Sequence, residues 1–133
     1  MVLCDELLQQ SGEWFSKGFR VRSLGGSCLV DMPLLDSGGD SITVVVAPSA
    51  KGFIVHDGGA IAGHLFSLGQ HTQNTLAFKL LRSLCQSYEL LLDFDQGLVK
   101  TETSKESLID TIFELTKIIV TMTTATTHIR PKR

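Results

Sequence analysis

The sequence predicts a single α+β domain over residues 1–133, in which helices flank an antiparallel sheet. Residues 42–47 are almost all β-branched, which suits a pleated strand better than a helix. Apolar residues recur at helical spacing in the last third of the chain, and clusters of Gly and Asp separate the segments. The chain length, with 43% hydrophobic and 20% charged residues, is typical of one globular core.

The first half of the chain predicts a helix followed by a three-stranded antiparallel meander. Residues 2–19 carry apolar side chains every three or four positions, which predicts an N-terminal helix. The three strands are expected at residues 28–35, 42–47 and 53–56, with turns rich in Gly, Asp and Pro between them. The sequence His-Asp-Gly-Gly at residues 56–59 then predicts a tight turn out of the sheet.

The second half predicts two short helices, a small hairpin and a long C-terminal helix. Residues 60–68 and 74–88 have helical spacing, and Gly69 is suited to end the first helix. Residues 90–94 and 98–101 are expected to pair as a hairpin. Thr103 and Glu106 have the spacing of a capping box, which predicts that the last helix starts there.

The predicted C-terminal helix carries an apolar stripe that leaves two interpretations open. If the helix continued to residue 128 it would be about 36 Å long, longer than a domain of this size is wide. The stripe either packs in the chain's own core or forms an interface with a second copy or another protein. Its residues are Leu108, Ile112, Leu115, Ile119 and Met122.

Charge and hydropathy argue against two classes of protein. A net charge of -2 is unlike a surface built to neutralise phosphates, although two small basic clusters are candidate nucleic-acid contacts. No membrane span is expected, because threonines interrupt the apolar stretch at residues 117–125. Acidic residues interrupt the first segment where a signal peptide would be apolar, so the sequence predicts a cytoplasmic protein. The basic clusters are Arg20 with Arg22, and Arg130 with Lys132 and Arg133.

The turn at residues 56–59 is where titratable side chains, a strand end and glycines converge. His56, Asp57, His64 and Asp40 are the candidate residues for a metal-dependent hydrolase or nuclease centred on Asp57. The alternative is structural, with Asp57 capping the next helix or closing the turn. The chain has neither a phosphate-binding loop nor a nucleophile elbow. We therefore assign no catalytic residue, no metal and no cofactor from the sequence.

Short motifs between residues 28 and 88 occur in a characteristic order. They are Met32-Pro33-Leu34-Leu35-Asp36, Gly39-Asp40, a β-branched strand, Val55-His56-Asp57-Gly58, and Gly69 between two helices. This order resembles a small bacterial and phage family catalogued as domain of unknown function 1828. That family tends to have two acidic residues before the Gly of the turn, whereas His56 is the first of the pair here. The resemblance implies a phage or mobile-element setting of host-parasite conflict, and no activity.

The function expected from the sequence is a non-enzymatic protein-binding module, acting as an inhibitor or accessory subunit. Its partner is another protein, either a host or defence-system protein or a second copy in a homodimer. The sheet surface and the C-terminal helix are the expected docking surfaces. Two alternatives stay open, the metal-dependent hydrolase or nuclease at Asp57 and a nucleic-acid-binding protein.

Overall fold

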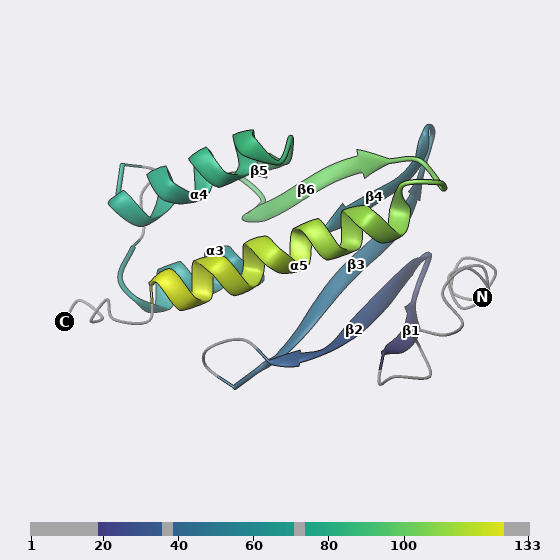
Figure 1. The fold of residues 1–133 in the computed structure, drawn as a ribbon, viewed down its shortest axis with the longest axis horizontal. Coiled ribbons are helices and arrows are strands. Elements are labelled where there is room, and N and C mark those ends of the chain that lie inside the picture. The colour runs from purple at the N-terminus through teal and green to yellow at the C-terminus, as the bar shows by residue number, and fades with distance from the viewer. Residues whose placement is uncertain (1–18, 36–38, 71–73, 127–133) are drawn as a thin grey trace.

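A computed structural model describes residues 19–35, 39–70 and 74–126 of the chain. Within these ranges, six strands form one antiparallel sheet in the order β1-β2-β3-β4-β6-β5 (Figure 1). The strands are β1 (Arg20–Leu24), β2 (Ser27–Leu35), β3 (Ser41–Ser49), β4 (Gly52–His56), β5 (Leu91–Asp93) and β6 (Leu98–Thr103). The described helices are α3 (Ala60–Ser67), α4 (Leu76–Ser87) and α5 (Leu108–Ala125).

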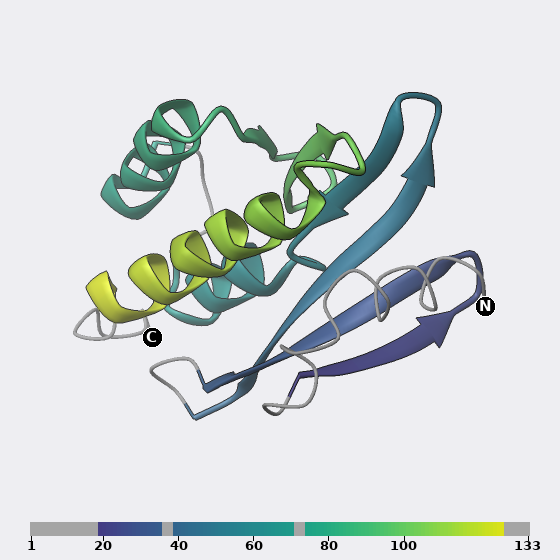
Figure 2. The ribbon, with the colours of Figure 1, turned by 45° about the vertical axis from the view of Figure 1, so that its right-hand side comes forward.

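The described helices pack together on one side of the sheet. Helix α5 runs across the sheet and contacts β3, β4 and β6, while α3 contacts both α5 and β6 (Figures 1 and 2). Helix α4 packs against β5 and α5. None of the helices in the described part of the chain is long and apolar enough to cross a membrane.

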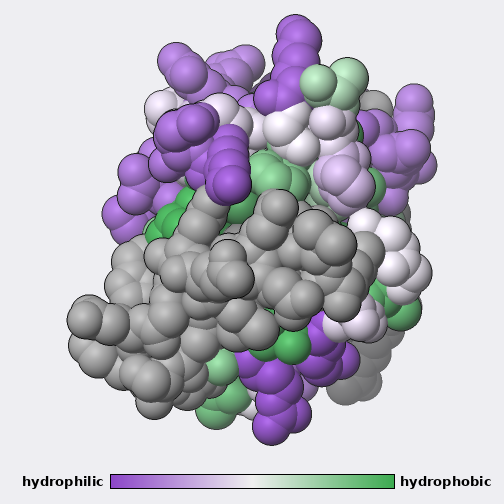
Figure 3. All heavy atoms as spheres, turned by 90° about the vertical axis from the view of Figure 1, so that its right-hand side faces the viewer, coloured by the Kyte–Doolittle hydropathy of each residue, from purple (hydrophilic) through white to green (hydrophobic). Residues whose placement is uncertain are grey.

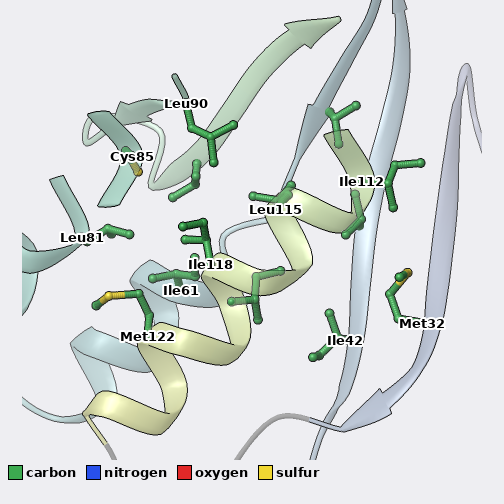
Figure 4. Packing of buried hydrophobic residues seen from close by; sticks show 14 of the residues in the cluster. Met32, Ile42, Ile61, Leu81, Cys85, Leu90, Ile112, Leu115, Ile118 and Met122 are labelled. Atoms are coloured by element: carbon green, nitrogen blue, oxygen red, sulfur yellow. The ribbon is translucent and has the colours of Figure 1, made fainter. Parts of the chain in front are cut away.

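The core lies between the sheet and these helices. Over residues 27–32 of β2 and 41–46 of β3 every second side chain is buried, as a strand with one covered face requires. Buried side chains from the sheet and from the three described helices meet in one cluster (Figure 4). It includes Met32, Ile42, Ile61, Leu81, Leu115 and Ile118.

The structure confirms the α+β class and the antiparallel sheet, but the sheet is larger than predicted. Residues 20–24 form the edge strand β1, which pairs with β2, so the meander has four strands. Strand β6 then pairs with β4, which joins the predicted hairpin to the same sheet. The predicted N-terminal helix falls on residues that lie outside the described ranges, apart from Phe19. The Phe19 ring packs edge-on against Phe113 of α5, with ring centroids 6.0 Å apart.

The predicted capping box at the start of the last helix is wrong. Thr103 is the final residue of β6, and its hydroxyl bonds to the hydroxyl of Thr111 at 2.9 Å instead of capping a helix. Helix α5 begins at Leu108, after the N-cap residue Ser107. Its 18 residues span about 27 Å, and residue 128 lies outside the described part.

Candidate functional site

Asp57 directly follows β4 and is buried, only 2% exposed, and both of its carboxylate oxygens accept backbone hydrogen bonds. Oδ1 accepts from the N–H groups of Gly59 at 3.0 Å and Val99 at 3.1 Å, and Oδ2 accepts from Ile61 N–H at 3.1 Å. The Ile61 bond satisfies a donor in the first turn of α3, and the Val99 bond fixes the start of β6. Asp57 therefore has the structural role that the sequence left as an alternative.

Two left-handed glycines make this arrangement possible. Gly58 has φ 65° and Gly59, the N-cap residue of α3, has φ 85°. Residues other than glycine rarely adopt this left-handed backbone conformation. The reversal places the first turn of α3 next to the Asp57 carboxylate. Gly59, the N-cap residue, has no side chain that could accept a hydrogen bond, so Asp57 caps the helix instead.

His56 is half-buried and is held by the same turn. Its Nδ1 accepts a hydrogen bond from Gly58 N–H at 3.0 Å, so this ring nitrogen carries no proton. Burial lowers the pKa of His56 below its ordinary value, Asp57 acts to raise it, and Lys100 lowers it further. The turn therefore favours the neutral imidazole.

His64 is directed to the end of α5. Its Nε2 lies 2.8 Å from the hydroxyl of Thr126, and that hydroxyl donates to the Met122 carbonyl at 2.6 Å. Because the hydroxyl has only one proton to give, His64 Nε2–H is the donor in the first bond. This contact links α3 to α5.

The structure does not bring Asp40 to the other three candidates. Asp40 is exposed and precedes β3, whereas the residue paired with His56 is Val45, further along the same strand. At the usual strand rise the distance from Asp40 to that pair is about 17 Å. Within the described ranges, no group of three or more His, Cys, Asp or Glu side chains could hold a metal ion. The set suggested for a metal-dependent hydrolase is therefore not assembled.

Arg22, from the first basic cluster, forms an ion pair with the Asp31 carboxylate. Its Nε and Nη2 donate to the two oxygens of Asp31 at 2.7 and 2.8 Å, and the Thr43 hydroxyl donates to Asp31 at 2.7 Å. The Arg22 hydrogen bonds are the largest cause of the lowered pKa of Asp31, which therefore stays ionised. Arg20 is exposed at the start of the same edge strand. The C-terminal cluster, Arg130, Lys132 and Arg133, lies outside the described residues.

The apolar stripe of α5 is part of the chain's own core. All five of its side chains are buried, at most 4% exposed, and belong to the cluster between the helices and the sheet. Fully burying one such side chain stabilises a fold by roughly 1.5–3 kcal/mol. The intramolecular interpretation therefore holds for Leu108, Ile112, Leu115, Ile119 and Met122.

The sequence suggested the sheet surface as a docking surface, but it did not reveal which residues form it. We call the face of the sheet away from the described helices the open face. Strand register places one residue from each strand directly opposite the next, so that all six side chains share this face. The described helices pack on the opposite side. The row is Arg22, Leu29, Val45, His56, Lys100 and Leu91.

Two hollows of opposite charge flank this row. The basic hollow has a volume of about 450 Å³ and contains two arginines against one aspartate. The acidic hollow, about 240 Å³, contains two glutamates, and its Lys100 is paired with Asp93 at 3.2 Å. The basic hollow is lined by Arg20, Arg22, Asp31, Met32, Ser41 and Thr43. The acidic hollow is lined by Ile54, Glu89, Leu91, Lys100, Thr101 and Glu102.

The end of the molecule near the β3–β4 turn has a different surface. In Figure 3 hydrophilic side chains gather over the upper part of this end, and hydrophobic ones appear only as small separate patches.

The chain matches no protein-family model, no curated protein and no solved structure. The resemblance of residues 28–88 to domain of unknown function 1828 therefore stays a prediction.

Proposed function

We propose that this chain is a non-enzymatic protein-binding module that docks a second copy of itself through the open face. The observation that carries the proposal is the row across the sheet, in which Leu29 and Val45 lie side by side and a hollow of opposite charge lies toward each side. Covering Leu29, Val45 and Leu91 supplies a favourable free energy, and the charges supply orientation.

A structural role accounts better than a catalytic one for the groups at the turn. Asp57 is buried with both oxygens bonded to backbone N–H groups, and His64 bonds to Thr126. These side chains stabilise the junction between the sheet and α3. Helix α5 does not belong to the docking surface, because its apolar stripe packs against the sheet.

Charge complementarity favours a second copy as the occupant of the open face. A face that carries a positive hollow and a negative hollow is complementary to its own rotated copy. A partner of one dominant charge would match one hollow and be repelled by the other. The motifs in residues 28–88 support a setting in phage or mobile-element biology, with the module acting in the cytoplasm against or beside a host protein.

Sedimentation velocity over a wide range of protein concentration tests this proposal. We expect the monomer to convert to a dimer as concentration rises. Carbene footprinting of the same samples should then show Leu91 on the open face becoming protected, while Leu76 on α4, which is 83% exposed, stays labelled. A monomer at every concentration, or protection of Leu76 alone, would overturn the proposal.

A further inference from the structure

We infer that the two copies exchange their hollows, so that Arg20 of each copy enters the acidic hollow of the other and contacts Glu102. The inference rests on the proposed function and adds the register of the dimer. It starts from the fact that Arg20 and Glu102 are both exposed and both lie on strands of the same sheet.

The acidic hollow has the chemistry to receive an arginine side chain. Ile54 and Leu91 form its apolar part, against which the methylene groups of an arginine can pack. Glu89 and Glu102 provide carboxylates for the guanidinium group, which binds such groups through paired hydrogen bonds. The charge of Lys100 is offset by its ion pair with Asp93.

Arg20 is the side chain of the basic hollow that can make this contact. Arg22 beside it is committed to both oxygens of Asp31 and helps to form the wall of the hollow. Arg20 lies directly opposite Asp31 in the strand register, and its side chain is exposed at the sheet edge. It can therefore extend toward a facing surface while Arg22 remains in place.

Two-fold symmetry makes both contacts form together. When two copies face each other, a two-fold axis can lie in the plane between them. The axis can be placed so that each of two chosen positions on one copy faces the other position on the second copy. The basic hollow of each copy then faces the acidic hollow of the other, and a single pairing occurs twice. Leu29 and Val45 lie between the hollows in the row, so they would be covered by the same association.

A charge swap tests this register directly. We expect Arg20→Glu and Glu102→Arg each to weaken dimerisation by roughly tenfold or more, because each places like charges together at two sites. The double variant R20E/E102R should recover most of the affinity, because it restores opposite charges in reversed positions. Lys79→Glu makes the same change of charge on an exposed face of α4 and should leave the dimer unchanged.

The outcomes separate this inference from the proposed function. If the dimer affinity of R20E/E102R is reduced by as much as the two single reductions combined, the proposed register is overturned, although the wild-type protein still dimerises. A wild-type protein that stays monomeric would overturn both. Circular dichroism of each variant, compared with the wild type, checks that these exposed substitutions leave the fold in place.

Discussion

At the residue scale, the Asp57 carboxylate joins two segments that are distant in the sequence through its three hydrogen bonds. The bond to the distant segment cannot be read from the residues around Asp57. Gly59 and Ile61 follow it closely in the chain, but Val99 is 42 residues away. The single carboxylate thereby caps α3 and sets the position of β6. A buried acceptor with three donors contributes more to stability than an exposed cap.

Replacing Asp57 should therefore be costly for stability. We expect Asp57→Ala to lower the free energy of unfolding by about 2–4 kcal/mol, because three backbone N–H groups lose their acceptor. Asp95→Ala, at an exposed turn, is the control and should change it by less than about 0.5 kcal/mol. Urea unfolding measures both. Equal stability of the Asp57→Ala variant and the wild type would contradict the capping role.

His56 makes stability depend on pH near neutrality. Because the fold lowers the pKa of His56 below 6.5, the unfolded chain binds a proton more readily than the folded chain. The stability that the neutral His56 contributes is fully present above the pKa that His56 has in the unfolded chain. It is lost as the pH falls through the lower pKa that His56 has in the folded chain. Protonation also removes the Nδ1 lone pair that accepts from Gly58 N–H.

His56→Asn isolates this effect. The asparagine oxygen can accept the Gly58 bond but does not titrate in this range. We expect the wild-type protein to lose more stability than the variant between about pH 7.5 and pH 5.5. Parallel curves of unfolding free energy against pH for the two proteins would show that His56 does not titrate as described.

At the scale of elements, α4 ends in a strained conformation. Glu89 has φ 57° and is the one residue other than glycine with a positive φ in the described ranges. Around it Leu90 N–H bonds to the Cys85 carbonyl at 2.8 Å and Glu89 N–H to the Gln86 carbonyl at 3.3 Å, the pattern of a Schellman motif. Glycine is the usual residue at this position. Glu89 is also one of the carboxylates in the acidic hollow.

Glu89→Gly should therefore stabilise the folded monomer. We expect the free energy of unfolding to rise by about 0.5–1 kcal/mol, because relief of the left-handed strain exceeds the added freedom of the unfolded chain. Gln86→Gly, inside the same helix, should lower it by about 1 kcal/mol. Thermal and urea unfolding at concentrations where the protein is monomeric give both values. A loss of stability in Glu89→Gly would contradict this account.

The elements differ in how far the sequence could predict them. Strand β3 was evident because its β-branched run is local. Strand β1 was missed because an edge strand exposes charged residues such as Arg20 and Arg22, which hide the alternation. The start of α5 was misplaced because Thr103 bonds across to Thr111 instead of along the backbone.

At the scale of the whole molecule, the open face could not be predicted from the sequence. Its row takes one side chain from each of six strands, and strand pairing brings them together. The basic hollow lies beside a shift in the register between Asp31 and Leu35, which local patterns do not encode. The turn at Asp57, in contrast, could be predicted because its residues are adjacent in the sequence. The hydrogen bond from Val99 to the Asp57 carboxylate could not, because Val99 is distant in the sequence.

A comparison of two lysine variants shows whether the open face docks a second copy. Leu91→Lys removes an exposed apolar side chain, 58% exposed, from this face, and Leu76→Lys makes the same change on α4. Sedimentation equilibrium should show a weaker dimer for Leu91→Lys and an unchanged one for Leu76→Lys. Equal dimerisation of Leu91→Lys and the wild type, or a loss only in Leu76→Lys, would contradict the claim.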